Sequence, residues 1–148
     1  MGLAGEKLVL LIERQRLSAG GRADLADQVV HVAVVEGDAA GHDIRSYELD
    51  ETPKFIEVKT TRGAATAAFF VSPNEIAFSQ AHADNYVLVR VFGYDDATDS
   101  ASFYRVDGAV DKAFDLEPTE YRASLSPRLK ITDSTSEPLV VRSTETGP

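Results

Sequence analysis

The sequence predicts an α/β fold in which one central sheet is flanked by helices. Stretches with alternating or continuous apolar residues indicate strands, and stretches with apolar residues three and four positions apart indicate helices. They follow one another as helix, short helix, three strands, helix and two strands. This order is typical of a single sheet with helices packed against it.

The first helix is expected over 3–17. Its apolar stripe is predicted to consist of Leu3, Leu8, Val9, Leu11 and Ile12, with Glu6, Glu13, Arg14 and Arg16 on the remaining surface. A second, short helix is predicted over 23–29, after a Gly-Gly pair that ends the first.

Five strands are predicted, over 31–35, 43–49, 54–61, 86–92 and 102–106. The fourth has no long polar face, so we expect it to lie centrally in the sheet. A further helix is expected over 73–83, because Ser72 can cap it, Pro73 suits its first turn and Glu75 holds the capping-box position.

The length of 148 residues suits one domain, which we place at 1–133, with an edge strand at 129–132 and a loose tail at 134–148. The absence of cysteine excludes disulfides and thiolate chemistry. No apolar run approaches about 18 residues, so we expect no membrane span. The N-terminus lacks a signal-peptide pattern, and a cytoplasmic location is compatible with these features.

The net charge is −9, from 15 basic and 24 acidic residues, and the basic residues are scattered singly. Because neutralisation of phosphates dominates nucleic-acid affinity, this balance weighs against tight, unaided binding to a polyanion. It leaves open a nuclease whose grip on DNA comes from a partner.

One motif points to chemistry. Glu57 and Lys59 are two residues apart on a predicted strand, so they share a face, while Val58 points into the opposite layer. Asp43, on the preceding predicted strand, can reach the same place from the side. Two carboxylates, a strand carbonyl at Val58 and an ammonium suit Mg²⁺ or Mn²⁺ and phosphodiester hydrolysis. The motif alone is not specific, since a Glu-x-Lys on a strand is commonly a solvated face with a weak ion pair.

With its order of elements, the chain resembles the PD-(D/E)XK restriction-endonuclease-like superfamily, whose core of helix, three-strand meander, helix and strand forms a mixed sheet. More narrowly, it resembles the family named after the C-terminal domain of the plant protein NO VEIN. The stretches that carry the resemblance lie within residues 5–91: Gly5-Glu6, Gly41-His42-Asp43-Ile44-Arg45-Ser46, Phe55-Ile56-Glu57-Val58-Lys59-Thr60-Thr61, Phe69-Phe70-Val71-Ser72-Pro73-Asn74-Glu75 and Tyr86-Val87-Leu88-Val89-Arg90-Val91.

The resemblance implies a role for four residues. Asp43 and Glu57 match the superfamily's metal ligands, Lys59 matches its catalytic lysine, and Glu6 matches a helical acid that assists a second metal. The proline of the superfamily's name is absent, because Gly41-His42 precede Asp43. The resemblance further implies DNA as substrate and a helicase or other defence-system protein as partner. Superfamily nucleases often dimerise to cut both strands, so a homodimer is compatible.

Other residues near the motif have a structural and a functional interpretation. We expect His42 to face away from Asp43 in a packing or surface role, with contact to the metal or substrate as the alternative. We expect Glu75 to act as a capping residue. Arg45 shares the face of Asp43 and suits a phosphate or an ion pair with Glu57. Surface roles are expected for Thr61, Arg62 and Gln80, with phosphate contact or catalytic support as the alternatives.

The sequence therefore supports a metal-dependent nuclease that acts on DNA within a defence or repair assembly. Its alternative is a catalytically silent module of the same fold that binds a partner protein or a nucleic-acid end. A third reading is a structural subunit, in which Lys59 closes an ion pair and no cavity lies over it. In the first case we expect Glu57 and Lys59 to be partly exposed.

Overall fold

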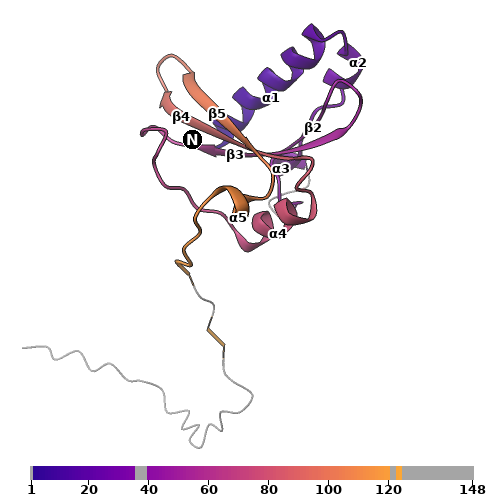
Figure 1. Cartoon of the computed structure of the whole chain (residues 1–148). Coiled ribbons are helices and arrows are strands. Elements are labelled where there is room, and N and C mark those ends of the chain that lie inside the picture. Colours follow the sequence, from indigo (N-terminus) through magenta and orange to yellow (C-terminus); the bar gives the residue numbers. More distant parts are fainter. Residues whose placement is uncertain (1, 36–39, 121–122, 125–148) are drawn as a thin grey trace, which may run out of the picture. The chain divides into compact units, whose positions relative to one another are not determined.

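A five-stranded mixed sheet with helices packed against it forms the core of the chain, which confirms the predicted α/β class (Figure 1). The computed structural model describes residues 2–35, 40–120 and 123–124. The chain divides into a unit at Met1–Leu116 and a unit at Glu117–Pro148, and the description below concerns the first. The predicted edge strand at 129–132 and the tail at 134–148 lie outside the described residues.

The helices are α1 (Gly2–Ala19), α2 (Ala23–Ala26), α3 (Val32–Val35), α4 (Pro73–Ala81) and α5 (Val110–Ala113). The strands are β1 (Val30–His31), β2 (Ile44–Tyr47), β3 (Pro53–Thr60), β4 (Tyr86–Asp95) and β5 (Ser100–Asp107). They lie in the order β1-β2-β3-β4-β5, and every pairing is antiparallel except that of β3 with β4. A parallel pair requires a crossover, and α4 supplies it. β4 lies inside the sheet, between β3 and β5, in agreement with its continuous apolar sequence.

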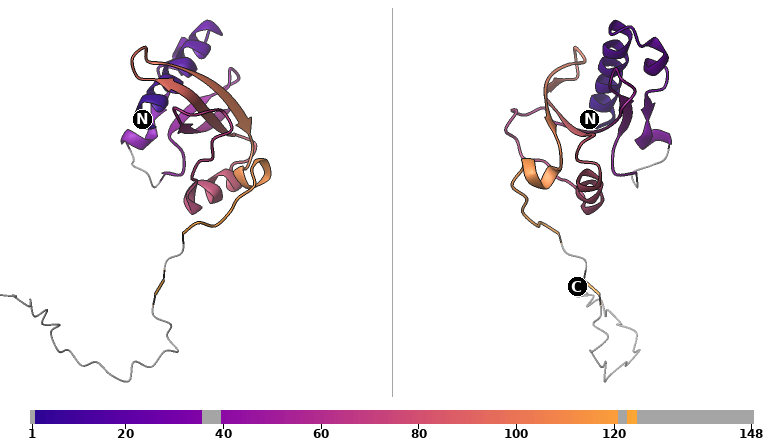
Figure 2. Two further views of the ribbon diagram at one scale, coloured as in Figure 1. Left: turned by 90° about the vertical axis from the view of Figure 1, so that its left-hand side faces the viewer. Right: turned by 45° about the vertical axis from the view of Figure 1, so that its right-hand side comes forward.

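The sheet has a separate apolar core on each face, and alternation along β3 and β4 assigns each residue to one of them. Ile56 and Val58 of β3 pack with α1. On the opposite face, Tyr86 and Leu88 of β4 pack with Val110 of α5 and with aromatic side chains around α4. Figure 2 shows α1 along one side of the sheet and α4 near α5 on the other.

The buried stripe of α1 differs from the predicted one. The buried positions are spaced four apart, at Gly5, Val9, Glu13 and Leu17, while Leu3 and Leu11 are exposed. The apolar stripe that the leucines predict is therefore wrong at Leu3 and Leu11. A glutamate occupies one core position because polar side chains of the sheet reach it, as described below.

The predicted strand over 31–35 is also wrong, because only Val30–His31 is a strand and Val32–Val35 is the short helix α3. The backbone N–H groups of Val32 and Ala33 both donate to the carbonyl oxygen of Asp43, at 2.8 and 3.3 Å. These contacts turn the chain into α3 despite the preference of valine for strands. Helix α5 is an element that the sequence analysis did not predict. Within the described part of the chain, no helix is long and apolar enough to cross a membrane.

Candidate functional site

Strand β3 places Glu57 and Lys59 side by side, since residues two apart share a face. Lys59 Nζ lies 2.7 Å from Glu57 Oε1. Val58, between them, is buried in the opposite core with α1, as predicted. The structure thus forms the expected carboxylate–ammonium pair.

Asp43 immediately precedes β2 and is fixed against β3 by its backbone and its side chain. Its N–H donates to the carbonyl of Ile56 at 2.9 Å, and its Oδ2 accepts from the N–H of Val58 at 2.8 Å. The N–H and C=O groups of one strand residue point to the same side, so the Val58 carbonyl also faces the side on which Asp43 lies.

Gly41, two residues before Asp43, permits this placement. Its φ of +77° is a left-handed conformation, and a Cβ there would lie 2.7 Å from the Cβ of Phe78 on α4. A larger residue would push the chain that carries Asp43 away from α4.

Glu6 reaches the site from the first turns of α1. Gly5 allows the approach, because a Cβ at that position would lie 1.9 Å from Thr60 Oγ1 on β3. The carboxylate of Glu6 contacts His31 on β1, with 2.7 Å between Oε2 and Nε2. The helical acid of the resemblance therefore lies near the end of β3.

Glu75 has two roles where the sequence predicts one. Ser72 and Glu75 form the predicted capping box of α4, in which Ser72 Oγ accepts from the N–H of Glu75 and Glu75 Oε2 accepts from the N–H of Ser72. The same Oε2 lies 2.8 Å from Lys59 Nζ. Lys59 is therefore held between two carboxylates, an arrangement that only the folded chain reveals.

These residues line one pocket of about 170 Å³. Its lining consists of Glu6, Ala33, Gly41, His42, Asp43, Glu57, Val58, Lys59 and Glu75. All four residues that the sequence analysis assigned to a site are among them. The ion pairs of Lys59 agree with the hypothesis of a structural subunit. That hypothesis also predicts that no cavity lies over Lys59, and the pocket contradicts it.

Negative charge exceeds positive charge in this pocket. Burial, followed by repulsion from Asp43, raises the pKa of Glu57 to about 8. Burial likewise raises the pKa of Asp43 to about 6, although its bond from Val58 opposes the rise and Glu6 adds to it. Burial lowers the pKa of Lys59, but Glu57 and Glu75 outweigh it and the net shift is upward. The pocket thus combines a firmly protonated lysine with carboxylates that lack sufficient counter-charge.

Two details differ from the expected site. Glu57 is buried rather than partly exposed, with 3% of its surface accessible, whereas Lys59 is partly accessible. Among the described residues, no group of three or more His, Asp or Glu side chains could hold a metal ion as arranged.

His42 packs, as predicted, but it does not face away from Asp43. Its ring stacks on Phe78 at 4.7 Å and lies edge-on to Phe55, on the same side of the sheet as Glu57. The strand alternation used for the prediction does not apply, because β2 begins only at Ile44.

The other residues with a proposed surface role make local contacts outside the pocket lining. Thr61 Oγ1 accepts from the N–H of Gly63, and Gln80 donates to Asp111. The exposed Arg62 pairs with Asp96 at 2.6 Å. Arg45 does not line the pocket either.

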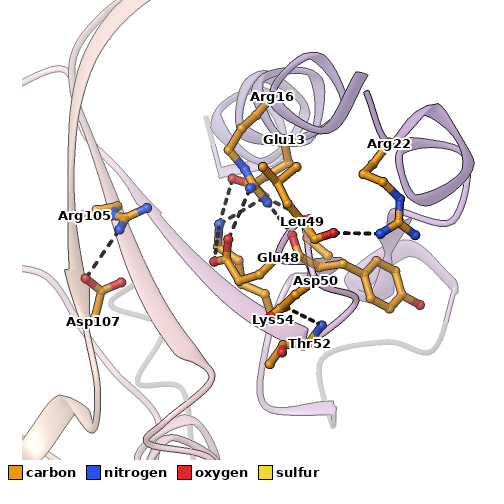
Figure 3. Close-up of polar contacts among 12 residues, drawn as sticks. Glu13, Arg16, Arg22, Glu48, Leu49, Asp50, Thr52, Lys54, Arg105 and Asp107 are labelled. Atoms are coloured by element: carbon orange, nitrogen blue, oxygen red, sulfur yellow. Dashed lines mark hydrogen bonds and ion pairs between the residues drawn. The ribbon is translucent and has the colours of Figure 1, made fainter. Parts of the chain in front are cut away.

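A second buried polar cluster lies on the α1 face of the same strand, and the sequence analysis missed it (Figure 3). Glu13 accepts from Lys54 Nζ at 3.2 Å, from Ser46 Oγ at 2.8 Å and from Arg16 at 2.9 Å. Glu48 contacts both Arg16 and Lys54. Burial raises the pKa of Glu13, but these hydrogen bonds and the charge of Lys54 outweigh it and hold the pKa below its ordinary value.

The fold and the pocket together define the class: an α/β domain in which a helix, a three-strand meander, a crossover helix and a strand surround a carboxylate–lysine pocket. A family model described as protein NO VEIN, C-terminal, matches residues 5–106, and the chain belongs to that family. The match covers both faces of the sheet and every residue of the pocket. No curated protein and no solved structure matches the chain.

Proposed function

We propose that the pocket is the active site of a metal-dependent phosphodiesterase that acts on DNA, with the restriction-endonuclease-like superfamily as its relative. One observation carries the proposal: the buried carboxylate of Glu57 and the partly buried carboxylate of Asp43 share a pocket with a protonated lysine and have raised pKa values. Perturbed carboxylates beside a fixed cation are typical of catalytic sites.

The residues fit a divalent cation. Asp43, Glu57 and the Val58 carbonyl offer three oxygen donors, of which only two are side chains, and hard oxygen donors suit Mg²⁺ and Mn²⁺. The surplus of negative charge in the pocket is what such an ion would neutralise. When bound, the ion would acidify water and offset charge on the phosphoryl oxygens.

The protein's own residues would then do the remaining work. Lys59 keeps its proton because its pKa is raised, so it acts as a hydrogen-bond donor toward water or a phosphoryl oxygen and not as a base. Glu75 holds the ammonium in place from the opposite side. Glu6 provides additional negative charge at the pocket edge.

The test is cleavage of supercoiled plasmid and of single-stranded DNA in Mg²⁺ or Mn²⁺. We expect Glu57→Ala to reduce cleavage by at least about a hundredfold. The matched control is Glu48→Ala, which removes a glutamate from the other cluster and should cleave like the parent. A folded parent that cleaves neither substrate in either metal would overturn an enzyme that acts alone, and would favour the partner-dependent enzyme or the silent module.

A second candidate is a catalytically silent module of the same fold that binds a partner protein or a nucleic-acid end. The ion pairs of Lys59 with both Glu57 and Glu75 favour it, because they occupy the catalytic groups with each other. Calorimetric titration with Mg²⁺ separates the two: the enzyme should bind the ion through Asp43 and Glu57, and the silent module need not.

We further propose that tight DNA binding depends on a partner, such as a helicase or another defence-system protein. The net charge of −9 supports this, since little positive charge is available for unaided binding.

A further inference from the structure

Arg90 is a buried cation without a buried anion. It is 2% exposed, and no ion pair among the described residues includes it; burial lowers its pKa and no carboxylate opposes that shift. Its Nη2 donates to the carbonyl of Ala67 at 3.0 Å, and its guanidinium lies 5.1 Å from the ring centre of Phe69. Its Nε is buried and has no hydrogen-bond partner.

The position of Arg90 places this cation next to the candidate site. Arg90 on β4 pairs in register with Lys59 on β3. Directly paired residues of neighbouring strands point to the same face, at strand spacing of about 4.8 Å. Arg90 therefore lies one strand beyond Lys59, on the face that carries Glu57, although it does not line the pocket itself.

A merely structural role explains the arginine poorly. A buried charge is costly unless it is paired, and one carbonyl with one aromatic ring does not satisfy a guanidinium that has five donors. A neutral side chain of similar length could make the same contact with Phe69 without that cost.

The segment that covers Arg90 runs from Arg62 to Phe70 and is held mainly at its two ends. The carbonyl of Gly63 accepts from the N–H of Gly93 at 3.0 Å, and Phe69 packs against the apolar cluster of Tyr86 and Leu88. The stretch between these contacts, 64–68, consists of four alanines and a threonine and forms neither helix nor strand. This stretch can move at smaller cost than a helix or strand, which would open the guanidinium to a ligand.

We propose that Arg90 is an anion-binding residue that takes a phosphate group of the substrate, next to the group bound at the Asp43–Glu57 pocket. A planar guanidinium binds phosphate through two parallel hydrogen bonds, and here the unpartnered Nε and the Nη2 released by Ala67 provide the donors. The identity of the substrate rests on the proposed function, whereas the contact between Arg90 and a phosphate group does not depend on it.

The first experiment uses inorganic phosphate as the probe and compares thermal unfolding in phosphate and in chloride at equal ionic strength. We expect phosphate to raise the Tm of the parent and of Arg62→Met by more than that of Arg90→Met, because binding to the folded state adds to the general stabilisation that phosphate gives any folded protein. Arg62 is the matched control, an exposed arginine in the covering segment. An equal phosphate shift in Arg90→Met would overturn the proposal.

A second measurement does not depend on a variant. In the parent, the Nε–H resonance of Arg90, assigned through bonds from the backbone, should shift on phosphate titration. A resonance that stays in place while phosphate raises the Tm would overturn the assignment to Arg90, even if Arg90→Met does not fold.

Binding of a labelled single-stranded oligonucleotide in EDTA extends the test to the substrate. We expect Arg90→Met to weaken the Kd by about tenfold to a hundredfold and Arg62→Met to leave it unchanged. Because no metal is present, this result is independent of cleavage. Oligonucleotide binding through Arg90 without cleavage would retain the anion site and reject a nuclease that acts alone, while cleavage with an unchanged Kd in Arg90→Met would reject the anion site and retain the nuclease.

Discussion

Two buried clusters of charged side chains lie on opposite faces of β3, and they differ in their balance of charge. On the α1 face, Glu13 is surrounded by Lys54, Arg16 and Ser46, and its pKa is lowered. On the other face, Lys59 must serve several carboxylates, and the pKa of Glu57 is raised to about 8.

This difference in charge balance distinguishes a cluster whose charges are paired from a cluster with too few positive charges. In the Glu13 cluster, each buried charge finds an opposite charge, so the folded state favours the ionised form. In the Glu57 cluster, the folded state opposes ionisation of its own carboxylates, and either a proton or an added cation relieves that opposition. The same strand thus carries one cluster with balanced charge and one with an excess of negative charge.

The largest expected effect is on stability. Glu13→Gln should lower the free energy of unfolding by about 3–5 kcal/mol, because it leaves the buried Lys54 with only the half-exposed Glu48 as its counter-charge. Glu57→Gln should cost less than about 1 kcal/mol, since it keeps the shape and removes the repulsion from Asp43. Urea unfolding of the two variants beside the parent measures both.

Both variants exchange a carboxyl group for an amide and keep the same number of non-hydrogen atoms, so each is the control for the other. Equal losses of stability would show that the two clusters have the same role, and the comparison would fail.

The two clusters should change the stability with pH in opposite directions. The contribution of the Glu57 cluster is lost as the pH rises, and that of the Glu13 cluster is lost in acid. Without divalent ions, the folded pKa of Glu57, about 8, lies above its ordinary 4.5, so its contribution is complete below pH 4.5 and is lost as the pH rises toward 8. We expect a loss of roughly 2–4 kcal/mol over that range, to which Asp43 contributes. Glu13 has a lowered pKa, so its contribution is present above 4.5 and is lost in acid.

Urea unfolding at several pH values in EDTA measures this profile. Glu57→Gln should reduce the loss of stability between pH 4.5 and 8 and leave the loss in acid unchanged. If the loss between pH 4.5 and 8 is unchanged in Glu57→Gln, other groups cause it.

Divalent ions should act on the unbalanced cluster alone. At pH 8, Mg²⁺ at about a hundredfold above its Kd should raise the free energy of unfolding by about 2.7 kcal/mol, because it binds only the folded state. Glu57→Gln and Asp43→Asn should lose this gain, and Glu48→Gln should keep it. A gain that survives in Asp43→Asn would place the ion outside the pocket.

Much of this architecture follows from local sequence. The apolar run of β4 predicts a central strand, and the Ser72–Glu75 capping box predicts the start of α4. Alternation along β3 correctly places Glu57 and Lys59 on one face. These signals are strong because each depends on neighbours in the chain.

The features that the sequence did not predict depend on contacts between segments that are distant in the sequence. Nothing near Glu13 in the sequence shows that Lys54, 41 residues later, will share its burial. In the same way, the role of Glu75 at Lys59 requires the crossover that brings α4 beside β3. The short helix α3 depends on the carbonyl of Asp43. Charge balance at each cluster is therefore a property of the fold, and the sequence alone reveals only the residues that take part.

The smallest expected effect tests whether balance or mere proximity stabilises the structural cluster. Glu48 contacts Arg16 and Lys54, as Glu13 does, but its side chain is 48% exposed. Because water screens an exposed pair, Glu48→Gln should lower the free energy of unfolding by at most about 1 kcal/mol in urea unfolding. A loss equal to that of Glu13→Gln would mean that burial does not set the strength of these contacts, and the contrast between the two faces of β3 would need another cause.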